Sequence, residues 1–219
     1  MKDIIIVCED SFGLDVKRIV LAINRHWENS GWGTPYRIKG YIGKNNISDS
    51  LKSLMSPYLG SIEEWTPPED EYCVMGIIEP HSKKKTVEEM KVKGAQFETL
   101  WAPWVMANLN FKFPEGCIIA AQSIMDSAQI GSFVTLFHSM VGFDAMVGDY
   151  SSVMAYANIA TSHVGNCVLI EDNGVVIGKT INNDVVVKAN SVVVREAKAG
   201  TIVSGNPARK LKPIKGRNI

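Results

Sequence analysis

Branched aliphatic residues return at a nearly constant interval along the second half of the chain. The positions are Ile118, Ile124, Ile130, Leu136, Val141, Val147, Val153, Ile159, Val164, Ile170, Val176, Ile181, Val187 and Val193. Ten of the thirteen steps are six residues long and three are five. That interval fits neither the helical period of about 3.6 residues nor the two-residue alternation of a half-buried strand. It is typical of a parallel β-helix, in which short strands wind around a triangular prism.

The hexad also predicts where each coil turns. With the aliphatic residue pointing inward, the position four residues later should be small, as at Ala128, Ala145, Ser151 and Ala157. Three hexads would form one coil of about 18 residues, so the chain has room for roughly four coils. A β-sandwich of short strands is the competing interpretation, but sandwiches do not hold a six-residue phase over this length.

The part of the chain before the repeat has a different pattern. Apolar runs predict strands at Ile4–Cys8, Tyr36–Ile42 and Tyr72–Ile78. Helical spacing predicts helices at Asp15–Trp27, Asp49–Leu59 and Thr86–Gly94, the last with Thr86 and Glu89 in capping-box spacing. This alternation predicts a small Rossmann-like α/β domain over residues 1–94, followed by a β-helix domain over residues 95–219.

Composition narrows the function classes. Among 219 residues, 23 Lys and Arg balance 23 Asp and Glu, so no field that would attract nucleic acid is expected. No apolar run approaches the length of a membrane span, and the run at residues 4–7 is too short for a signal peptide. Cys8, Cys73, Cys117 and Cys167 are scattered without CxxC spacing. They indicate a reducing cytoplasm, and no metal site is predicted.

The end of the repeat carries a second motif. Residues 203–209 read V-S-G-N-P-A-R. With the hexad, this segment resembles the left-handed β-helix (hexapeptide-repeat) acyltransferases, and the preceding α/β domain is similar to that of bacterial sugar N-acetyltransferases and sialic acid O-acetyltransferases. The resemblance implies a homotrimer with active sites between adjacent helices and acetyl-CoA or another acyl-CoA as co-substrate. It also implies a histidine that takes a proton from a sugar amine or hydroxyl.

The helix departs from this family at the position of the catalytic base. The family's histidine corresponds to Phe143, whose ring cannot accept a proton. Asp144 keeps the acid that would orient the base, and a second family histidine corresponds to Ser152. The chain therefore keeps the frame of the family's active site without its usual catalyst.

The N-terminal domain departs as well. The family's glycine-rich loop, whose backbone N–H groups approach phosphates, corresponds to residues 8–13, where only Gly13 is retained. Glu9 and Asp10 in this loop would repel phosphate, and an acidic pair expected after the second strand is Gly43-Lys44. The substrate-binding candidates that the resemblance leaves in the loop are Asp10, Ser11 and Phe12.

The chain has four histidines that could replace the missing base. His26 and His81 are predicted at the surface. His138 stands two residues after an inward aliphatic position, as the family's base does, but one hexad early. His163 is predicted about one coil above Asp144. The base is therefore His138, His163 or neither, and in the last case the site is inactive or uses Asp144 or a different scheme.

Candidate coenzyme contacts follow from the resemblance. They are Ser152, Ala189, Asn206, Ala208, Arg209 and Lys210. The basic side chains among them would pair with the coenzyme's phosphates, unless residues 209–217 are an ordinary basic tail. The lysines at 83–85 are predicted to be a solvated charge run.

Two functional hypotheses remain at this stage. The first is an acyl-CoA-dependent acyltransferase that acts on the amine or hydroxyl of a sugar or sugar nucleotide in bacterial surface-glycan synthesis. The second is a non-catalytic member of the fold that binds a partner or ligand as a trimer.

Overall fold

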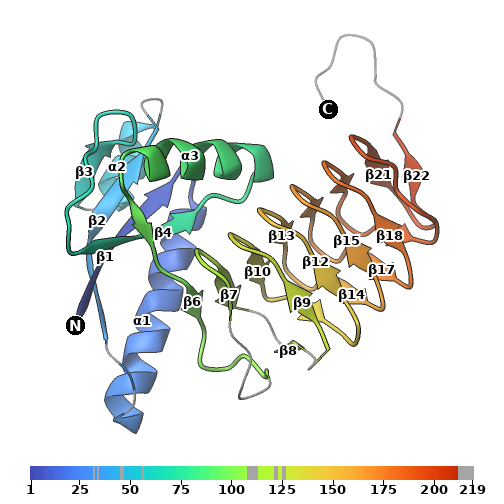
Figure 1. Ribbon diagram of the computed structural model, residues 1–219, viewed down its shortest axis with the longest axis horizontal. Helices are drawn as coiled ribbons and strands as arrows, with labels where there is room; N and C mark the ends of the chain where they lie inside the picture. Colours follow the sequence, from blue (N-terminus) through green and yellow to red (C-terminus); the bar gives the residue numbers. More distant parts are fainter. Residues whose placement is uncertain are drawn as a thin grey trace.

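The computed structural model describes residues 1–31, 33, 35–44, 47–55, 57–107, 113–120, 123–124 and 127–211. An α/β layer formed by the first part of the chain packs against one end of a prism of stacked coils (Figure 1). Helix α3 runs along the side where the two parts meet (Figure 1).

The N-terminal sheet has five parallel strands in the order β3-β2-β1-β4-β5. Its strands are β1 (Lys2–Cys8), β2 (Tyr36–Gly43), β3 (Tyr58–Ser61), β4 (Glu71–Gly76) and β5 (Gln96–Phe97). Its helices are α1 (Phe12–Ser30), α2 (Asp49–Leu54) and α3 (Pro80–Val92). The three predicted strands and three predicted helices are present. The helix expected over residues 49–59 is too long, because the chain turns after Leu54 and adds β3.

Helix α3 begins six residues earlier than the capping-box spacing predicts. The Glu79 carboxylate accepts hydrogen bonds from the backbone N–H groups of His81 and Ser82. Pro80 occupies the first turn, where its missing N–H costs nothing. The prediction of a start at Thr86 is therefore wrong, and Thr86 is buried within the helix.

The earlier start changes the environment of Lys83. Lys83, Val87 and Met90 fall on one face of α3, at helical spacing, and this face is buried. The Lys83 side chain is only 1% exposed. The prediction of a solvated run at residues 83–85 is wrong at this position, because the run lies inside a helix rather than in a turn.

The β-helix has three faces. The first face contains β6 (Leu100–Trp101), β7 (Ile118–Ala120), β10 (Thr135–Phe137), β13 (Ser152–Val153), β16 (Leu169–Ile170), β19 (Val186–Val187), β21 (Ile202–Ser204) and the antiparallel β22 (Arg209–Lys210). The second face contains β8 (Ser123–Ile124), β11 (Met140–Val141), β14 (Asn158–Ala160), β17 (Val175–Ile177) and β20 (Val192–Val193). The third face contains β9 (Gln129–Ile130), β12 (Met146–Val147), β15 (His163–Val164) and β18 (Thr180–Ile181).

Most stacked strands pair residues 17 apart rather than about 18, although β11 pairs with β14 at 18 and β19 pairs with β21 at 16. Most coils therefore contain one step of five residues. The repeat also starts one residue later than predicted. Ile119 pairs with the inward Leu136 and lies in the core of the β-helix, whereas Ile118 packs in the core beneath α1.

The coils turn through residues in the left-handed backbone region. Four of them form one vertical row, which we call the first corner: Phe133, Tyr150, Cys167 and Asp184, with φ between 54° and 61°. Beside this row, the side chain of each of Asp149, Asn166 and Asn183 accepts a hydrogen bond from a backbone N–H one coil below. This ladder fixes the first corner, so its side chains project from defined positions.

The two parts share a packed interface. The Phe12 and Phe137 rings meet edge to face with centroids 5.3 Å apart, and Phe97 and Phe133 do so at 5.1 Å. Along the chain, β5 is the last strand of the N-terminal sheet and β6 is the first strand of the β-helix. Among the described residues, no helix combines the length and apolar character needed to cross a membrane.

Candidate active site

His138 lies at the corner between the first and second faces, immediately after β10. Its φ is 48°, and the side chain is half-buried. The imidazole is parallel to the Trp104 indole at 6.4 Å between centroids and contacts the Phe137 ring at 4.5 Å. These rings limit the positions open to the imidazole.

The loop after β1 reaches the same corner. Phe12 packs on Phe137, which in turn contacts His138. The structure thus brings the predicted substrate loop and one predicted base together. Phe12 itself is 4% exposed and belongs to the core, so its ring is not free to stack on a substrate. Asp10 and Ser11 are exposed.

The acidic residues of this loop have partners within the chain. Asp10 Oδ1 accepts a hydrogen bond from the Phe12 backbone N–H at 2.8 Å. The Glu9 carboxylate forms an ion pair with Lys44 and accepts a hydrogen bond from the Ser82 hydroxyl. Glu9 after β1 and Lys44 after β2 both differ from the family pattern. Their opposite charges pair, so the two differences compensate each other. The Asp10 carboxylate therefore occupies the N-terminus of α1, where a phosphate would bind.

The glycine retained in the loop is required by space. A Cβ on Gly13 would lie 2.9 Å from Cys8 Cβ and 3.0 Å from Cys8 Sγ. The first turn of α1 approaches the end of β1 this closely only without a side chain. Gly13 thus preserves the tight turn after β1, although the other glycines of the family loop are absent.

Phe143 and Asp144 lie at a different corner, between the second and third faces. The Phe143 side chain is 63% exposed, and Asp144 is exposed with a φ of 51°. The Asp144 backbone N–H donates to Ser127 Oγ at 2.8 Å. Among the described residues, no hydrogen bond or ion pair joins Asp144 to His138.

His163 lies on the third face, in β15, with an exposed side chain. It pairs with Met146 on the preceding coil. His163 therefore lies one coil beyond the corner that holds Asp144, two positions along the chain from the stacking partner of Asp144. It borders a shallow groove of about 350 Å³ that Asp149 and Asn166 also line. Within one chain, the three catalytic candidates therefore occupy three separate places. His26 and His81 are exposed, as predicted.

Ser152 is fully buried at the interface with α3. Its hydroxyl donates to the Ile78 carbonyl at 2.6 Å and accepts from Lys83 Nζ at 2.7 Å. Both hydrogen-bonding roles are filled inside the chain, so this side chain is inaccessible to a coenzyme. Ser152 is therefore not part of the proposed coenzyme site.

A basic groove of about 390 Å³ lies at the C-terminal end of the β-helix. Its lining includes the predicted Ala208, Arg209 and Lys210, and β22 pairs the last two with β21. Arg195 and Lys198, which were not predicted as coenzyme contacts, also line it. The sequence does not indicate these two residues, because they approach the closing motif only when their coil stacks beside it.

The other two coenzyme candidates lie outside the lining of this groove. The Ala189 backbone N–H donates to Glu171 Oε2 at 3.0 Å, and Asn206 is exposed in the turn between β21 and β22. Three of the six predicted coenzyme residues therefore come together.

No protein-family model matches this chain, and no curated protein is significantly similar to it. Solved structures are similar in fold. A mutant of GDP-perosamine N-acetyltransferase from Caulobacter crescentus, in complex with CoA and GDP-perosamine, has a TM-score of 0.74 at 15% identity over 97% of this chain and 98% of that one. The acetyltransferase domain of PglB from Neisseria gonorrhoeae gives 0.70 at 15% identity, covering 96% and 100%.

A third similar structure is WeeI from Acinetobacter baumannii, with a TM-score of 0.59 at 17% identity, covering 96% of this chain and 100% of that one. All three likenesses extend over both parts of the chain. They confirm the predicted fold, an α/β domain followed by a left-handed β-helix, and its resemblance to sugar acetyltransferases.

Proposed function

We propose that the protein is an acyl-CoA-dependent acyltransferase that acylates an amine or hydroxyl of a sugar in bacterial surface-glycan synthesis. The observation that carries this proposal is the C-terminal groove, where the cations Arg195, Lys198, Arg209 and Lys210 outnumber the one acid of the lining, Glu196. Four cations suit the phosphates of coenzyme A. The structures of similar fold support the choice, since they are described with CoA or acetyl-CoA bound. The comparisons give the non-catalytic alternative no support.

The reaction needs a base for the acceptor and a carbonyl to attack. The acceptor's amine or hydroxyl loses a proton to an imidazole and forms a bond to the thioester carbonyl carbon. The carbon–sulfur bond then breaks, and the coenzyme leaves as a thiol after receiving the proton. We assign the base to His138, because it is the candidate that lies beside the loop after β1.

The acceptor side of the proposal follows from the charges in that loop. Similar structures are described with GDP-perosamine, a sugar nucleotide. Here Asp10 occupies the start of α1 by accepting the Phe12 N–H, while Glu9 beside it pairs with Lys44. We therefore propose a sugar acceptor whose phosphates, if it has any, do not bind at the N-terminus of α1.

The proposal includes a homotrimer in the cytoplasm. Within one chain, His138 and the C-terminal groove lie at opposite ends of the β-helix. In a trimer, the coils of a neighbouring β-helix would lie against the corner that carries His138. The cytoplasmic location rests on the four cysteines, all of which are free and buried. Light scattering coupled to size-exclusion chromatography tests the trimer.

Titration calorimetry with acetyl-CoA tests the coenzyme site. We expect the Arg209→Ala/Lys210→Ala variant to bind at least tenfold more weakly than the parent. Lys85→Ala, which removes an exposed cation on α3, should bind like the parent. Equal affinity in all three proteins would exclude the C-terminal groove as the phosphate site.

Release of coenzyme A thiol, measured with a panel of amino sugars and their nucleotides, tests the reaction. We expect His138→Ala to lose at least 100-fold in rate at unchanged coenzyme affinity, within the range of general-base catalysis of about 10² to 10⁴. His163→Ala should retain the parent's rate. Loss of activity in His163→Ala alone would move the base to the third face.

A further inference from the structure

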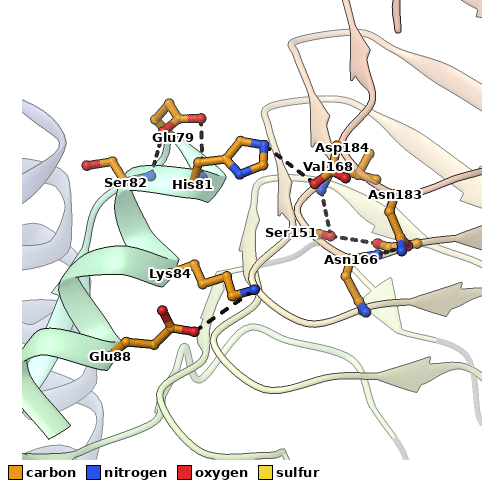
Figure 2. A network of polar contacts seen from close by, with 11 residues as sticks. Glu79, His81, Ser82, Lys84, Glu88, Ser151, Asn166, Val168, Asn183 and Asp184 are labelled. Atoms are coloured by element: carbon orange, nitrogen blue, oxygen red, sulfur yellow. Dashed lines mark hydrogen bonds and ion pairs between the residues drawn. The ribbon is translucent and has the colours of Figure 1, made fainter. Parts of the chain in front are cut away.

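Three side chains with metal-binding atoms converge where α3 meets the first corner. His81 lies in the first turn of α3, and Cys167 and Asp184 are consecutive members of the corner row. Figure 2 shows the His81 ring extending from α3 towards Asp184 across the boundary between the two domains. The three residues are distant in sequence, which is why no metal-ligand spacing reveals them.

The distances are close to those of a metal centre. His81 Nε2 lies 3.5 Å from Asp184 Oδ1. The imidazole nitrogen, the Cys167 thiol and the carboxylate oxygen all lie within 4.8 Å of one another. Around a tetrahedral zinc ion with bonds of about 2.0 to 2.3 Å, such atoms stand about 3.3 to 3.6 Å apart. The nitrogen and oxygen already have this separation. Side-chain rotations that move the ligand atoms by about 1 Å would bring all three into tetrahedral geometry.

Both sides of the cluster are held in place by the backbone. The His81 backbone N–H is capped by Glu79. The Cys167 N–H donates to the Asp149 carbonyl, and the Asp184 N–H donates to the Asn166 carbonyl, each at 2.9–3.0 Å. Below them in the first corner, Phe133 and Tyr150 stack on each other with centroids 5.4 Å apart. The first two members of the first corner are therefore packed aromatic rings. The next two, Cys167 and Asp184, carry metal-binding atoms at the level of His81.

The donor set selects among metals. One thiolate, one imidazole and one carboxylate suit zinc, whereas magnesium and calcium prefer oxygen ligands. Two negative ligands would balance the charge of a divalent ion. The Cys167 residue is buried, but the side chains of His81 and Asp184 are 62% and 47% exposed, which leaves a path from solvent and room for a water as the fourth ligand.

We propose that His81, Cys167 and Asp184 form a zinc site that ties the N-terminal domain to the β-helix. One ligand comes from α3 and two come from successive coils, so a bound ion would restrain the two parts relative to each other. The site is separate from the proposed coenzyme groove and from His138, and it does not depend on the proposed function.

Metal titration of the full-length protein, first stripped with a chelator, tests the site. We expect one equivalent of Co²⁺ to give a thiolate-to-cobalt charge-transfer band, which Zn²⁺ then displaces. Zn²⁺ should also raise the midpoint of thermal unfolding. Cys167→Ser should lose the band. Asp184→Asn removes a direct ligand, so it should weaken Zn²⁺ binding by more than the roughly 10- to 100-fold that is typical when a residue supporting a ligand is removed.

Two controls separate this site from adventitious binding. Cys117→Ser removes a different buried thiol and should keep the band, and His163→Ala removes an exposed imidazole on the third face and should keep the affinity. The proposal is overturned if Cys167→Ser binds Co²⁺ with the parent's spectrum. It is equally overturned if the folded parent binds no Zn²⁺ at about 100 µM, far above the dissociation constant of a structural zinc site.

Discussion

Lys83 should make the stability of this protein depend on pH just above neutrality. Its ammonium group is buried and reaches four oxygens, at Phe133 O (3.2 Å), Thr135 Oγ1 (3.0 Å), Ser151 O (3.4 Å) and Ser152 Oγ (2.7 Å). None of the four is a carboxylate. Burial disfavours the charged form and lowers the pKa of Lys83 from 10.5 to about 7, although Cys117, Cys167 and Glu79 act in the opposite direction.

The sign and size of the effect follow from proton linkage. Above pH 7 the folded protein has released the Lys83 proton, whereas the unfolded chain keeps it up to about pH 10.5. Unfolding then takes up a proton, so raising the pH stabilises the fold by about 1.4 kcal/mol per pH unit. Between pH 7.0 and 8.5 the free energy of unfolding should rise by about 2 kcal/mol.

The upper limit of this range avoids a second effect. Burial raises the pKa of Cys8 and of Cys73 from 9.0 to about 12. Their contribution is complete below pH 9 and is lost as the pH rises towards 12, opposite in sign to that of Lys83. Measurements that stop at pH 8.5 keep the two apart.

Urea denaturation at pH 7.0 and 8.5, with a chelator present, measures the effect. The parent should gain about 2 kcal/mol, and Lys83→Met, which keeps the length of the side chain without its amine, should gain less than about 0.5 kcal/mol. Lys85→Met, at a position 74% exposed, is the matched control and should behave like the parent. A parent that shows no rise would refute the reasoning and mean that the four oxygens keep the ammonium charged despite burial.

Three further substitutions test the packing. Leu136→Ala, at the centre of the β-helix core, should cost about 2 to 5 kcal/mol in urea denaturation, and a cost below 1 kcal/mol would contradict its assigned inward position. Gly148→Ala would place a Cβ 2.6 Å from the Gly165 carbonyl carbon, so it should cost about 1 to 3 kcal/mol and lower the thermal midpoint. Gly60→Ala meets no atom but has a φ of 124°, so it should cost about 1 to 2 kcal/mol through backbone strain alone.

The β-helix was predictable because one physical requirement repeats. Every coil needs an inward aliphatic side chain on each face, and this requirement leaves a period in the sequence that survives small shifts. The shifts themselves were less visible. Ile118 and Ile119 are both apolar, and only the pairing with Leu136 decides that Ile119 faces the core while Ile118 faces α1.

The features that the sequence did not reveal depend on contacts between distant segments. A lysine in a charged run is expected to be solvated. Lys83 faces inward because α3 begins at Pro80, which places residue 83 on the buried face of the helix. Likewise, the basic groove forms because stacking places Arg195 and Arg209 in the lining of one cavity. The candidate base and the loop after β1 could be named from the sequence, but their proximity could not, since it depends on the contact of Phe12 with Phe137.

The first turn of α3 connects these separate features. Three consecutive residues point in three directions: His81 to Asp184 in the first corner, Ser82 to Glu9 in the loop after β1, and Lys83 to Ser152 inside the interface. Successive side chains on a helix diverge by about 100°, so one short turn can contact three neighbours. Because the turn is a rigid unit, a shift that relieves one contact must strain the others. The orientation of the loop after β1 is therefore tied to the β-helix through α3 as well as through the direct contact of Phe12 with Phe137.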